Sequence, residues 1–353
     1  MSQDSAVGVS GAGDSPAPVA PSGPIEPPHP HHQSPRSVWA RIRSVDELRV
    51  LAVLAVLVTA VTVVNPRFVS IPSVANITQQ ASVFGIIALG MVFLLSMGEL
   101  DLSVGGNYAL CAMSMALLAQ AGVNLWLAAL IAILVGAALG ALNALLSNAL
   151  RVSIIVISLG TLAAYRGGTL VVSGAGSVTG GEPDALFFTL LGGSIRGIPA
   201  LTVAFLILTV ILAFVYTKTS FGFAVRAVGS NAHAARLSGY PINRIRVQVA
   251  GLVGVLCGIS GVLTFAFFGA ADPAVGTGYE LLVIAAAVIG GTALSGGQGT
   301  VVGAAIGALI VSVINGALIS FGVSVNYAGF VTGVVIVGAV ALDSLLKRRK
   351  SAT

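Results

Sequence analysis

Charge is what this sequence lacks most. Only 8% of its 353 residues are Asp, Glu, Lys or Arg, whereas 56% are hydrophobic. Soluble domains use about 25% charged residues, so soluble domains of this length are excluded. The composition predicts an all-α polytopic membrane protein, because a chain of helices satisfies its own backbone in lipid.

Cysteine is almost as scarce, and this scarcity excludes disulfide-stabilised domains and cysteine-based metal sites. Cys111 and Cys257 each lie inside an apolar run, so the chain has neither a disulfide framework nor metal-ligand spacing. His29, His31 and His32 lie in a Pro-rich stretch without Cys or acidic partners, which favours a solvated tail over a metal site. We expect no metal and no cofactor.

Motifs for nucleic acid, nucleotide and catalysis are also missing. No basic stripe is interleaved with aromatic residues, so we expect no nucleic-acid partner. The glycine-rich segment 290–300, GGTALSGGQGT, lacks the Lys-Ser/Thr pair of a phosphate-binding loop. No residues assemble a nucleophile, a base and an oxyanion site. We therefore expect a protein that is not an enzyme and has no nucleotide site of its own.

Long apolar stretches are abundant from residue 48 onward. A helix needs about 20 apolar residues to cross a bilayer, and the sequence predicts about ten such helices, some short or broken. Glycines bracket the eighth stretch, a pattern typical of half-helices whose backbone lines a cavity. The predicted spans are 48–64, 80–97, 104–120, 125–147, 153–172, 199–216, 247–268, 280–294, 300–320 and 326–345.

The ends of the chain differ from this apolar region. Eight of the 14 prolines lie in the first 35 residues, which have almost no large apolar side chains. We predict a disordered cytoplasmic tail over 1–36, a transmembrane domain over 37–346 and a basic cytoplasmic tail over 347–353. The basic run 347–350 can determine topology or bind lipid.

Lys and Arg are distributed unevenly between the predicted loops. Positive residues in short loops are retained on the cytoplasmic side. With both termini cytoplasmic and an even number of spans, only Arg67 and Arg196 lie outside, and Arg166 lies within the fifth span. The other 14 lie inside: Arg36, Arg41, Arg43, Arg49, Arg151, Lys218, Arg226, Arg236, Arg244, Arg246, Lys347, Arg348, Arg349 and Lys350. We expect a multi-pass protein of a prokaryotic cytoplasmic membrane.

The longest predicted cytoplasmic loop, 217–246, contains a helix signal. Asn231 can cap a short helix over 232–237, and Ser238-Gly239 followed by Pro241 ends it. Such a helix either anchors the loop at the membrane interface or receives a cytoplasmic partner, and we favour the partner.

Seven residues at predicted membrane depth carry polar chemistry. Asp101 or Ser103 can cap the third span, or Glu99 and Asp101 can accept hydrogen bonds from a polar solute in a translocation path. Arg166 can reach the outer interface or gate such a path. Glu280 has the same ambiguity at a helix start. The candidate set for a path or a structural motif is Glu99, Asp101, Ser103, Asn107, Tyr165, Arg166 and Glu280.

Four ordered motifs carry a family resemblance over about 48–345. GELDLSVGG at 98–106 resembles the Gly-x-Ile-Asp-Leu-Ser-Val-Gly element of ribose-type ABC sugar importer permeases, with Leu100 where Ile is usual. SLGT at 158–161 with Arg166-Gly167 resembles a second element, and the segment 221–246 resembles the coupling loop. The longest match is 278–310. The chain is thus similar to the branched-chain amino acid and sugar permease superfamily.

This resemblance implies a type II importer fold and specific partners. They are a cytoplasmic ABC ATPase, an extracytoplasmic sugar-binding protein, a second permease chain in a homodimer, membrane lipid and a small sugar substrate. The coupling-loop residues it implies are Asn231, Ala234, Ala235, Arg236, Leu237, Ser238 and Gly239.

Other functions stay open at this point. An ion-coupled secondary transporter would use the intramembrane carboxylates. An importer permease for a nucleoside or a branched-chain amino acid would keep the architecture and change the cargo, whereas the Asp-Leu-Ser-Val-Gly element favours sugar. A channel-like protein is disfavoured because no ion filter is evident.

Overall fold

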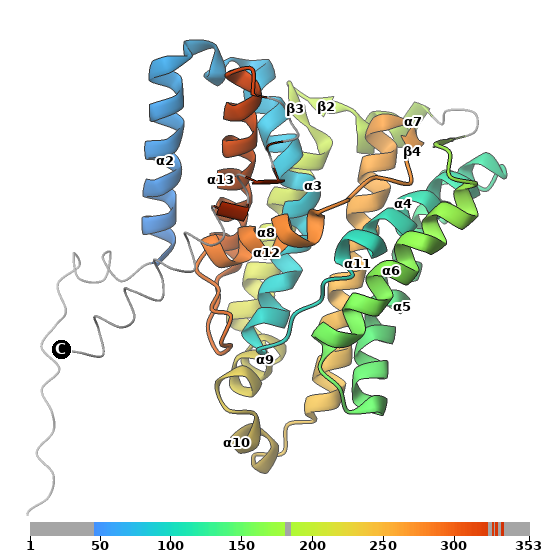
Figure 1. Cartoon of the computed structure of the whole chain (residues 1–353), viewed down its shortest axis with the longest axis vertical. Helices are drawn as coiled ribbons and strands as arrows, with labels where there is room; N and C mark the ends of the chain where they lie inside the picture. The colour runs from blue at the N-terminus through green and yellow to red at the C-terminus, as the bar shows by residue number, and fades with distance from the viewer. Residues whose placement is uncertain (1–45, 181–184, 324–326, 328, 331–332, 335–353) are drawn as a thin grey trace, which may run out of the picture. The chain divides into compact units, whose positions relative to one another are not determined.

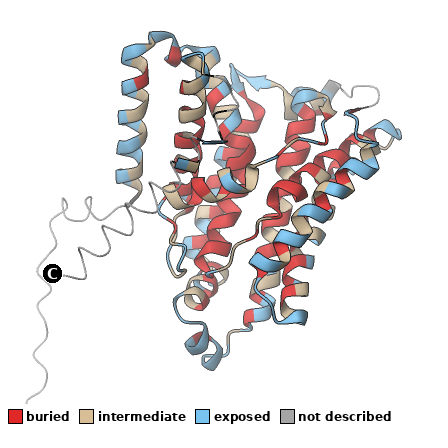
Figure 2. Ribbon diagram, in the orientation of Figure 1, coloured by how far each residue is buried: buried red, intermediate tan, exposed pale blue. Residues whose placement is uncertain are grey.

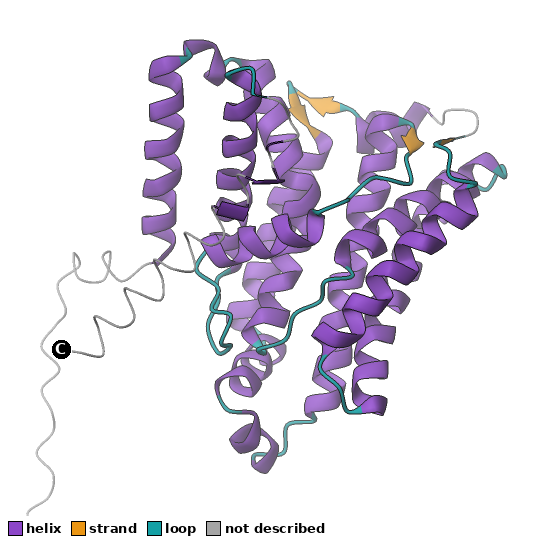
Figure 3. Ribbon diagram, viewed as in Figure 1, coloured by secondary structure: helices purple, strands orange, loops and turns teal. Residues whose placement is uncertain are grey.

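The computed structural model describes residues 46–180, 185–323, 327, 329–330 and 333–334. In this part the chain is predominantly helical, which confirms the all-α prediction (Figures 1 and 3). The predicted tails 1–36 and 347–353 and most of the tenth span lie outside the described residues. The helices are α2 (Asp46–Val64), α3 (Ile71–Ser96), α4 (Val104–Gln120), α5 (Leu125–Leu150), α6 (Ile154–Ser173), α7 (Ala185–Phe187), α8 (Ala200–Lys218), α9 (Ser220–Ser230), α10 (Ala232–Leu237), α11 (Ile242–Phe268), α12 (Tyr279–Ile289) and α13 (Val301–Ser320).

Short elements connect these helices at the end of the bundle opposite α9 and α10 (Figure 3). They include a 3₁₀ turn, η1 (Pro66–Val69), and a π turn, η2 (Phe188–Gly192). Four two-residue strands form two antiparallel pairs, which tie loops together and close no sheet. The pairs are β1 (Val178–Thr179) with β4 (Ala270–Ala271), and β2 (Ser194–Ile195) with β3 (Ile198–Pro199).

Seven of the described helices are long and apolar enough to cross a membrane, and they define a multi-pass membrane protein. These are α2, α3, α5, α6, α8, α11 and α13. α12 has 11 residues, which at 1.5 Å per residue gives about 16 Å against a hydrocarbon core of about 30 Å. It is therefore a half-helix, as the bracketing glycines predict.

Most predicted helix bounds agree with the structure, and three differ. α4 spans 104–120 as predicted. α3 begins at Ile71 rather than 80, because Pro72 suits a first helical turn and the polar residues after it still form helix. α11 begins at Ile242 rather than 247, so its first turns include two arginines that hydropathy discounts. α12 ends at Ile289 rather than 294, because Gly290 and the left-handed Gly291 stop it.

α3 and α11 form the buried centre of the bundle (Figure 2). α3 packs against α8, α11, α12 and α13, and α11 also packs against α4 and α5. By contrast α2 is exposed along most of its length and packs mainly against α13. Asn65 Nδ2 donates to Ser320 Oγ at 2.7 Å near one end of this pair, and Thr300 Oγ1 bonds Glu47 Oε1 at 2.7 Å near the other. α2 and α13 therefore run parallel and side by side.

Glycine allows α5 and α11 to pack backbone against backbone. A Cβ added at Gly136 would collide with the carbonyl oxygen of Gly254, and one added at Gly140 would collide with that of Ala250. Small residues at such a face let membrane helices approach closely, which gains dispersion energy that lipid cannot supply. This contact holds α5 and α11 close together.

Two non-helical segments enter the bundle from opposite ends and meet inside it (Figure 1). Residues 97–103 lead from α3 to α4, and residues 269–278 lead from α11 to α12. A Cβ added at Gly105 would lie 2.8 Å from the carbonyl oxygen of Gly276, and one added at Gly276 would lie 3.1 Å from that of Gly105. We call this meeting point, around Gly105 and Gly276, the crossing. Irregular backbone at membrane depth is stable only when protein or trapped water satisfies it.

The basic loops gather at the α9 and α10 end of the bundle. Arg151 follows α5, Lys218 ends α8, and Arg244 and Arg246 begin α11. Arg67 lies in η1, at the opposite end. This separation supports the orientation predicted from charge, with the α9 and α10 end cytoplasmic.

Candidate functional site

The helix predicted within 217–246 is present as α10. The Asn231 side chain accepts a hydrogen bond from the Ala234 N–H at 2.9 Å, which caps the first turn. After Ser238, Gly239 takes φ +85°, a left-handed conformation that glycine adopts without strain. The rest of the segment differs from a loop, because α9 precedes α10 directly and α11 follows two residues after Tyr240.

α10 projects from the end of the bundle, and most of its surface is exposed (Figure 1). Only Ala235 is buried, so this residue seats the helix on the bundle. Leu237 is 78% exposed and lies beside the exposed Arg236. An isolated exposed leucine is common, but here it lies on a rigid, capped element with a basic neighbour.

The end of α9 is in backbone contact with two other segments. A Cβ added at Gly229 would collide with the Ser96 carbonyl oxygen at the end of α3, and Gly297 N–H donates to that same oxygen at 2.8 Å. Gly296, at φ +85°, packs against Gly98. We call this contact, formed by 96–98, 229–230 and 296–297, the glycine joint. Close packing in this joint accounts for Gly296 and Gly297 of the segment 290–300.

Tyr216 of α8 makes contacts with the end of α3 and with α9. Ser96 Oγ and the Tyr216 hydroxyl are 2.7 Å apart, which ties α8 to the end of α3. Arg226 donates to the Tyr216 carbonyl oxygen, and its guanidinium lies 5.0 Å from the centre of the Tyr216 ring. α9 is therefore linked through Tyr216 to the end of α3.

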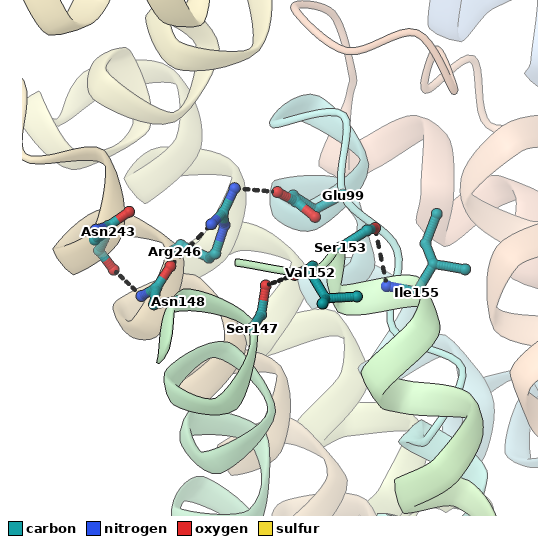
Figure 4. A network of polar contacts seen from close by, with 8 residues as sticks. All are labelled: Glu99, Ser147, Asn148, Val152, Ser153, Ile155, Asn243 and Arg246. Atoms are coloured by element: carbon teal, nitrogen blue, oxygen red, sulfur yellow. Dashed lines mark hydrogen bonds and ion pairs between the residues drawn. The ribbon is translucent and has the colours of Figure 1, made fainter. Parts of the chain in front are cut away.

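A second link joins the start of α11 to the segment after α3 (Figure 4). Arg246 Nη2 and Glu99 Oε1 form an ion pair at 2.5 Å, with side chains 24% and 13% exposed. Arg246 Nη1 also donates to Asn148 Oδ1 at 2.8 Å, and Asn148 Nδ2 donates to the Asn243 carbonyl oxygen at 3.2 Å. The network thus connects α5, α11 and the segment that leads to Asp101.

Asp101 lies inside the bundle in a complete set of hydrogen bonds. Its Oδ1 accepts from the Ser103 N–H at 2.7 Å, and its Oδ2 accepts from Asn143 Nδ2 at 3.1 Å. Asn143 Nδ2 also donates to Ser103 Oγ at 2.7 Å, and Asn143 Oδ1 accepts from the Tyr165 hydroxyl at 3.1 Å. We call Asp101, Ser103, Asn143 and Tyr165 the Asp101 cluster. It fastens the break before α4 to α5 and α6.

Arg166 and Glu280 lie on opposite sides of the crossing. Arg166 Nη1 donates to the Val275 carbonyl oxygen at 2.6 Å. Its Nη2 and Glu280 Oε2 are both buried and have no hydrogen-bond partner. A Cβ added at Gly105 would lie 3.2 Å from Arg166 Nη2 and would collide with Glu280 Oε2. Two opposite charges therefore face one point without forming an ion pair.

The candidate polar residues therefore occupy separate places. Glu99 is in the network with Arg246, three residues are in the Asp101 cluster, and Arg166 and Glu280 are at the crossing. Asn107 instead donates to the Gly136 carbonyl oxygen at 3.1 Å and accepts from Cys111 Sγ at 3.3 Å, so it joins α4 to α5. The capping prediction needs a correction: α4 has no side-chain cap, because Asp101 bonds the Ser103 N–H before the helix and Asn143 bonds the Ser103 hydroxyl.

Sequence reasoning missed Asn143, Asn148 and Arg246 as members of these networks. Asn143 is a fully buried amide in an otherwise apolar helix, and that isolation was the available signal. Arg246 was assigned to topology alone, although it lies on the apolar face of a helix start. Within the described ranges, no group of three or more His, Cys, Asp and Glu side chains could hold a metal ion.

Together, these features indicate the general class of protein to which the chain belongs. A multi-pass bundle with internal breaks, a half-helix and a projecting capped helix at its basic end is the architecture of a membrane transport subunit. The family model described as branched-chain amino acid transport system / permease component matches residues 73–340, and the chain belongs to this family.

Curated relatives cover most of the chain. The D-allose transport system permease protein AlsC of Escherichia coli strain K12 is 39% identical over 282 residues, 80% of this chain and 86% of the relative. The ribose import permease protein RbsC of Bacillus subtilis strain 168 is 37% identical over 290 residues, 82% and 89% of the two chains. The autoinducer 2 import system permease protein LsrC of Enterobacter sp. strain 638 is 34% identical over 285 residues, 81% and 82%. No solved structure matches the chain.

Proposed function

We propose that this chain is the permease subunit of an ATP-driven importer that moves a monosaccharide of the pentose or hexose class across the cytoplasmic membrane. The observation that carries the proposal is α10, a capped and exposed helix whose base is joined through the glycine joint to the end of α3. A subunit that receives mechanical work from a separate ATPase needs such an element.

The proposed cycle is alternating access. ATP-driven closure of a cytoplasmic ATPase pair displaces α10, and the glycine joint and the Arg246–Glu99 pair pass this displacement to the two internal breaks. α9 is packed against the end of α3, and α10 is packed against α9, which favours transmission of the displacement. The contact residues on this chain are Asn231, Ala234, Ala235, Arg236, Leu237, Ser238 and Gly239.

Two further partners belong to this proposal. An extracytoplasmic sugar-binding protein delivers the solute, and a second copy of this chain completes the membrane unit as a homodimer. α6 supports the second copy, because Gly160 and Gly167 are exposed with open space around them and small residues favour helix contact in lipid. The exposed apolar side chains of α2 contact membrane lipid.

Sugar is favoured over an amino acid or a nucleoside on two grounds. The relatives named for D-allose and ribose are 37–39% identical over about four fifths of the chain. The Asp-Leu-Ser-Val-Gly element also supplies Asp101 and Ser103 of the Asp101 cluster. A branched-chain amino acid or nucleoside cargo is the closest alternative within the importer class.

The coupling role is tested by substitution at the exposed Gly239 after α10 and at the buried Ala235 that seats α10 on the bundle. Gly239→Arg and Ala235→Glu are expected to leave membrane insertion and ATPase binding measurable while sugar uptake falls at least tenfold relative to ATP hydrolysis. Gly122→Arg, in the exposed turn after α4, is the matched control and is expected to change neither activity. Uptake equal to wild type in both α10 variants, at normal expression and assembly, contradicts the docking role.

An ion-coupled secondary transporter is the second candidate, and the partnerless buried Glu280 Oε2 is the observation in its favour. Glu99 is neutralised by Arg246 and Asp101 is hydrogen-bonded, so neither is available as a free proton carrier. Sugar uptake into vesicles that contain this chain alone, driven by an ion gradient without ATP, would establish this alternative.

A further inference from the structure

The crossing holds two buried polar atoms that the proposed transport cycle does not use. Arg166 Nη2 carries donor hydrogens and Glu280 Oε2 carries lone pairs, and neither has a partner. An unsatisfied buried polar atom is destabilising, and more so when the group is charged. Both atoms lie close to the space beside Gly105, so a third group placed there can bond both.

The depth of this point makes the arrangement more informative. Arg166 lies seven residues before the end of α6 at Ser173, which is roughly 10 Å at 1.5 Å per residue. Arg166 and Glu280 are both half-buried. Charged groups at this depth avoid lipid and face protein or a water-filled path. The location of these two side chains therefore suits a polar path better than a lipid contact.

Glycine shapes the space between the two charges. Gly105 has no side chain, and a Cβ there would collide with Glu280 Oε2 and lie 3.2 Å from Arg166 Nη2. The other half of the guanidinium is held by the Val275 carbonyl oxygen. Arg166 is thus fixed at one edge, with its second nitrogen turned to the gap.

A hydroxyl group satisfies both atoms at once. Its oxygen accepts from Arg166 Nη2, and its hydrogen is donated to Glu280 Oε2. A single carboxylate there would be attracted by Arg166 and repelled by Glu280, and a single ammonium the reverse, whereas a neutral hydroxyl bonds both groups without repulsion, so the pair favours a hydroxyl over either ion. Water and a sugar both provide this group.

We propose that Arg166 and Glu280 form a hydroxyl-binding site at the crossing, where a polyhydroxylated solute binds weakly during passage. The identification of the solute as a sugar rests on the proposed function, whereas the site itself does not. Each charge-assisted hydrogen bond contributes enough for roughly a tenfold to hundredfold change in apparent affinity.

The test uses the purified full-length chain in lipid nanodiscs. The thermal unfolding midpoint is measured against increasing D-ribose and D-allose, and against trimethylamine N-oxide, an osmolyte without hydroxyl groups. For wild type we expect a saturable rise with at least one sugar and a non-saturating rise with the osmolyte. In Arg166→Gln and in Glu280→Gln the saturable part is expected to require at least tenfold more sugar.

A charge-removing control lies away from the crossing. Arg196→Gln removes an exposed basic residue in the β2–β3 turn. This variant is expected to keep the wild-type sugar response. Size-exclusion profiles identify any variant that does not fold, and the wild-type titration alone still tests the proposal.

The outcomes are distinct. A non-saturating wild-type response to both sugars overturns the solute site. If the two substitutions then also change the sugar-free midpoint, the hydroxyl group between the charges is that of water. An unchanged sugar response in both folded variants overturns the role of these residues. Failure of the complete transporter to take up sugar, with the nanodisc response intact, contradicts the proposed function and leaves the site standing.

Discussion

The Asp101 cluster and the crossing are both polar, both lie inside the bundle and both adjoin the first turn of α4, yet they differ in one respect. Asp101 has partners on both carboxylate oxygens, and Asn143 bonds three different residues. Arg166 Nη2 and Glu280 Oε2 have none. Two neighbouring regions of the fold therefore differ: the buried carboxylate of Asp101 is hydrogen-bonded, whereas the charged groups at the crossing have buried atoms without a partner.

This difference indicates a structural role for the Asp101 cluster and a role in solute passage for the crossing. A fully satisfied network is rigid and expensive to disturb, because removing any partner leaves another group buried without one. A partly satisfied pair is stable only if something mobile completes it. We infer that the Asp101 cluster holds the break open at a fixed place and that the crossing is where the path uses that break.

The largest effect is expected from Asn143→Leu. The substitution removes hydrogen bonds to Asp101, Ser103 and Tyr165 and leaves a buried carboxylate short of a partner, at a cost of about 3–5 kcal/mol. We expect most of the protein to be lost from the monodisperse peak in size-exclusion chromatography. Leu145→Ala, at an exposed position on the same helix, is the control and is expected to behave as wild type.

If Asn143→Leu gave a normal peak and a normal thermal midpoint, the contrast between the two regions would be wrong. The corresponding substitution at the crossing, Arg166→Gln, is expected to leave the peak intact, because it removes a nitrogen without a partner and only one hydrogen bond, from Nη1 to the Val275 carbonyl oxygen.

A smaller effect is expected from Gly229→Ala. The added methyl group would collide with the Ser96 carbonyl oxygen, and such overpacking costs about 1–3 kcal/mol. A lower thermal midpoint, together with weaker coupling of uptake to ATP hydrolysis, is the expected result. Gly251→Ala on α11 makes only ordinary contacts at 3.9 Å and is the matched control. Equal midpoints for the two variants would show that the glycine joint is not tightly packed.

A still smaller effect is expected from the Arg246–Glu99 pair. A double-mutant cycle with Glu99→Gln and Arg246→Met is expected to give an interaction energy of about 1 kcal/mol, reduced at high salt because the pair is partly exposed. Arg246→Met combined with Asp272→Asn should be additive. If the effects of Glu99→Gln and Arg246→Met are additive, the two side chains do not interact, and the pair has no part in the coupling route.

The smallest effect concerns the exposed loop between α11 and α12. Hydrogen bonds from the Ser177 hydroxyl and the Ala274 N–H hold the pKa of Asp272 below its ordinary value of 3.8. A lowered pKa means that this stabilisation is complete above the ordinary value and is lost as pH falls through the lowered one. Hydrogen exchange of 269–278 is expected to rise below about pH 4 in wild type and to be less pH-dependent in Asp272→Asn. Equal pH dependence would show that the bonds do not form.

Much of the architecture could be predicted from the sequence, because the signals are local. Apolar runs located α2 to α6, α8 and α11 to α13, and Asn231 with Gly239 and Pro241 located α10, since a cap and a stop act within a few residues. α7 and α9 were not predicted. The half-helix α12 was indicated by the glycines on either side of it. The early start of α3 was missed because its first turns are polar.

The polar networks could not be predicted in the same way. Asn143 and Asp101 are 42 residues apart, and Arg246 and Glu99 are 147 residues apart. Such pairs depend on how α5 and α11 pack, and that packing is set by backbone contact between glycines. The sequence indicated which residues were costly at membrane depth, but not which partner each one had.

The central claim, that α10 receives an ATPase, is tested most directly by cross-linking. Both natural cysteines, Cys111 and Cys257, are buried, so Leu237→Cys places one exposed thiol on α10 of the full-length chain. The chain is purified with its endogenous partners in mild detergent and treated with a thiol cross-linker. The account predicts a roughly stoichiometric ABC ATPase that cross-links to residue 237 with a yield that changes on adding ATP. Elution without an ATPase, together with solute transport on an ion gradient alone, would contradict it.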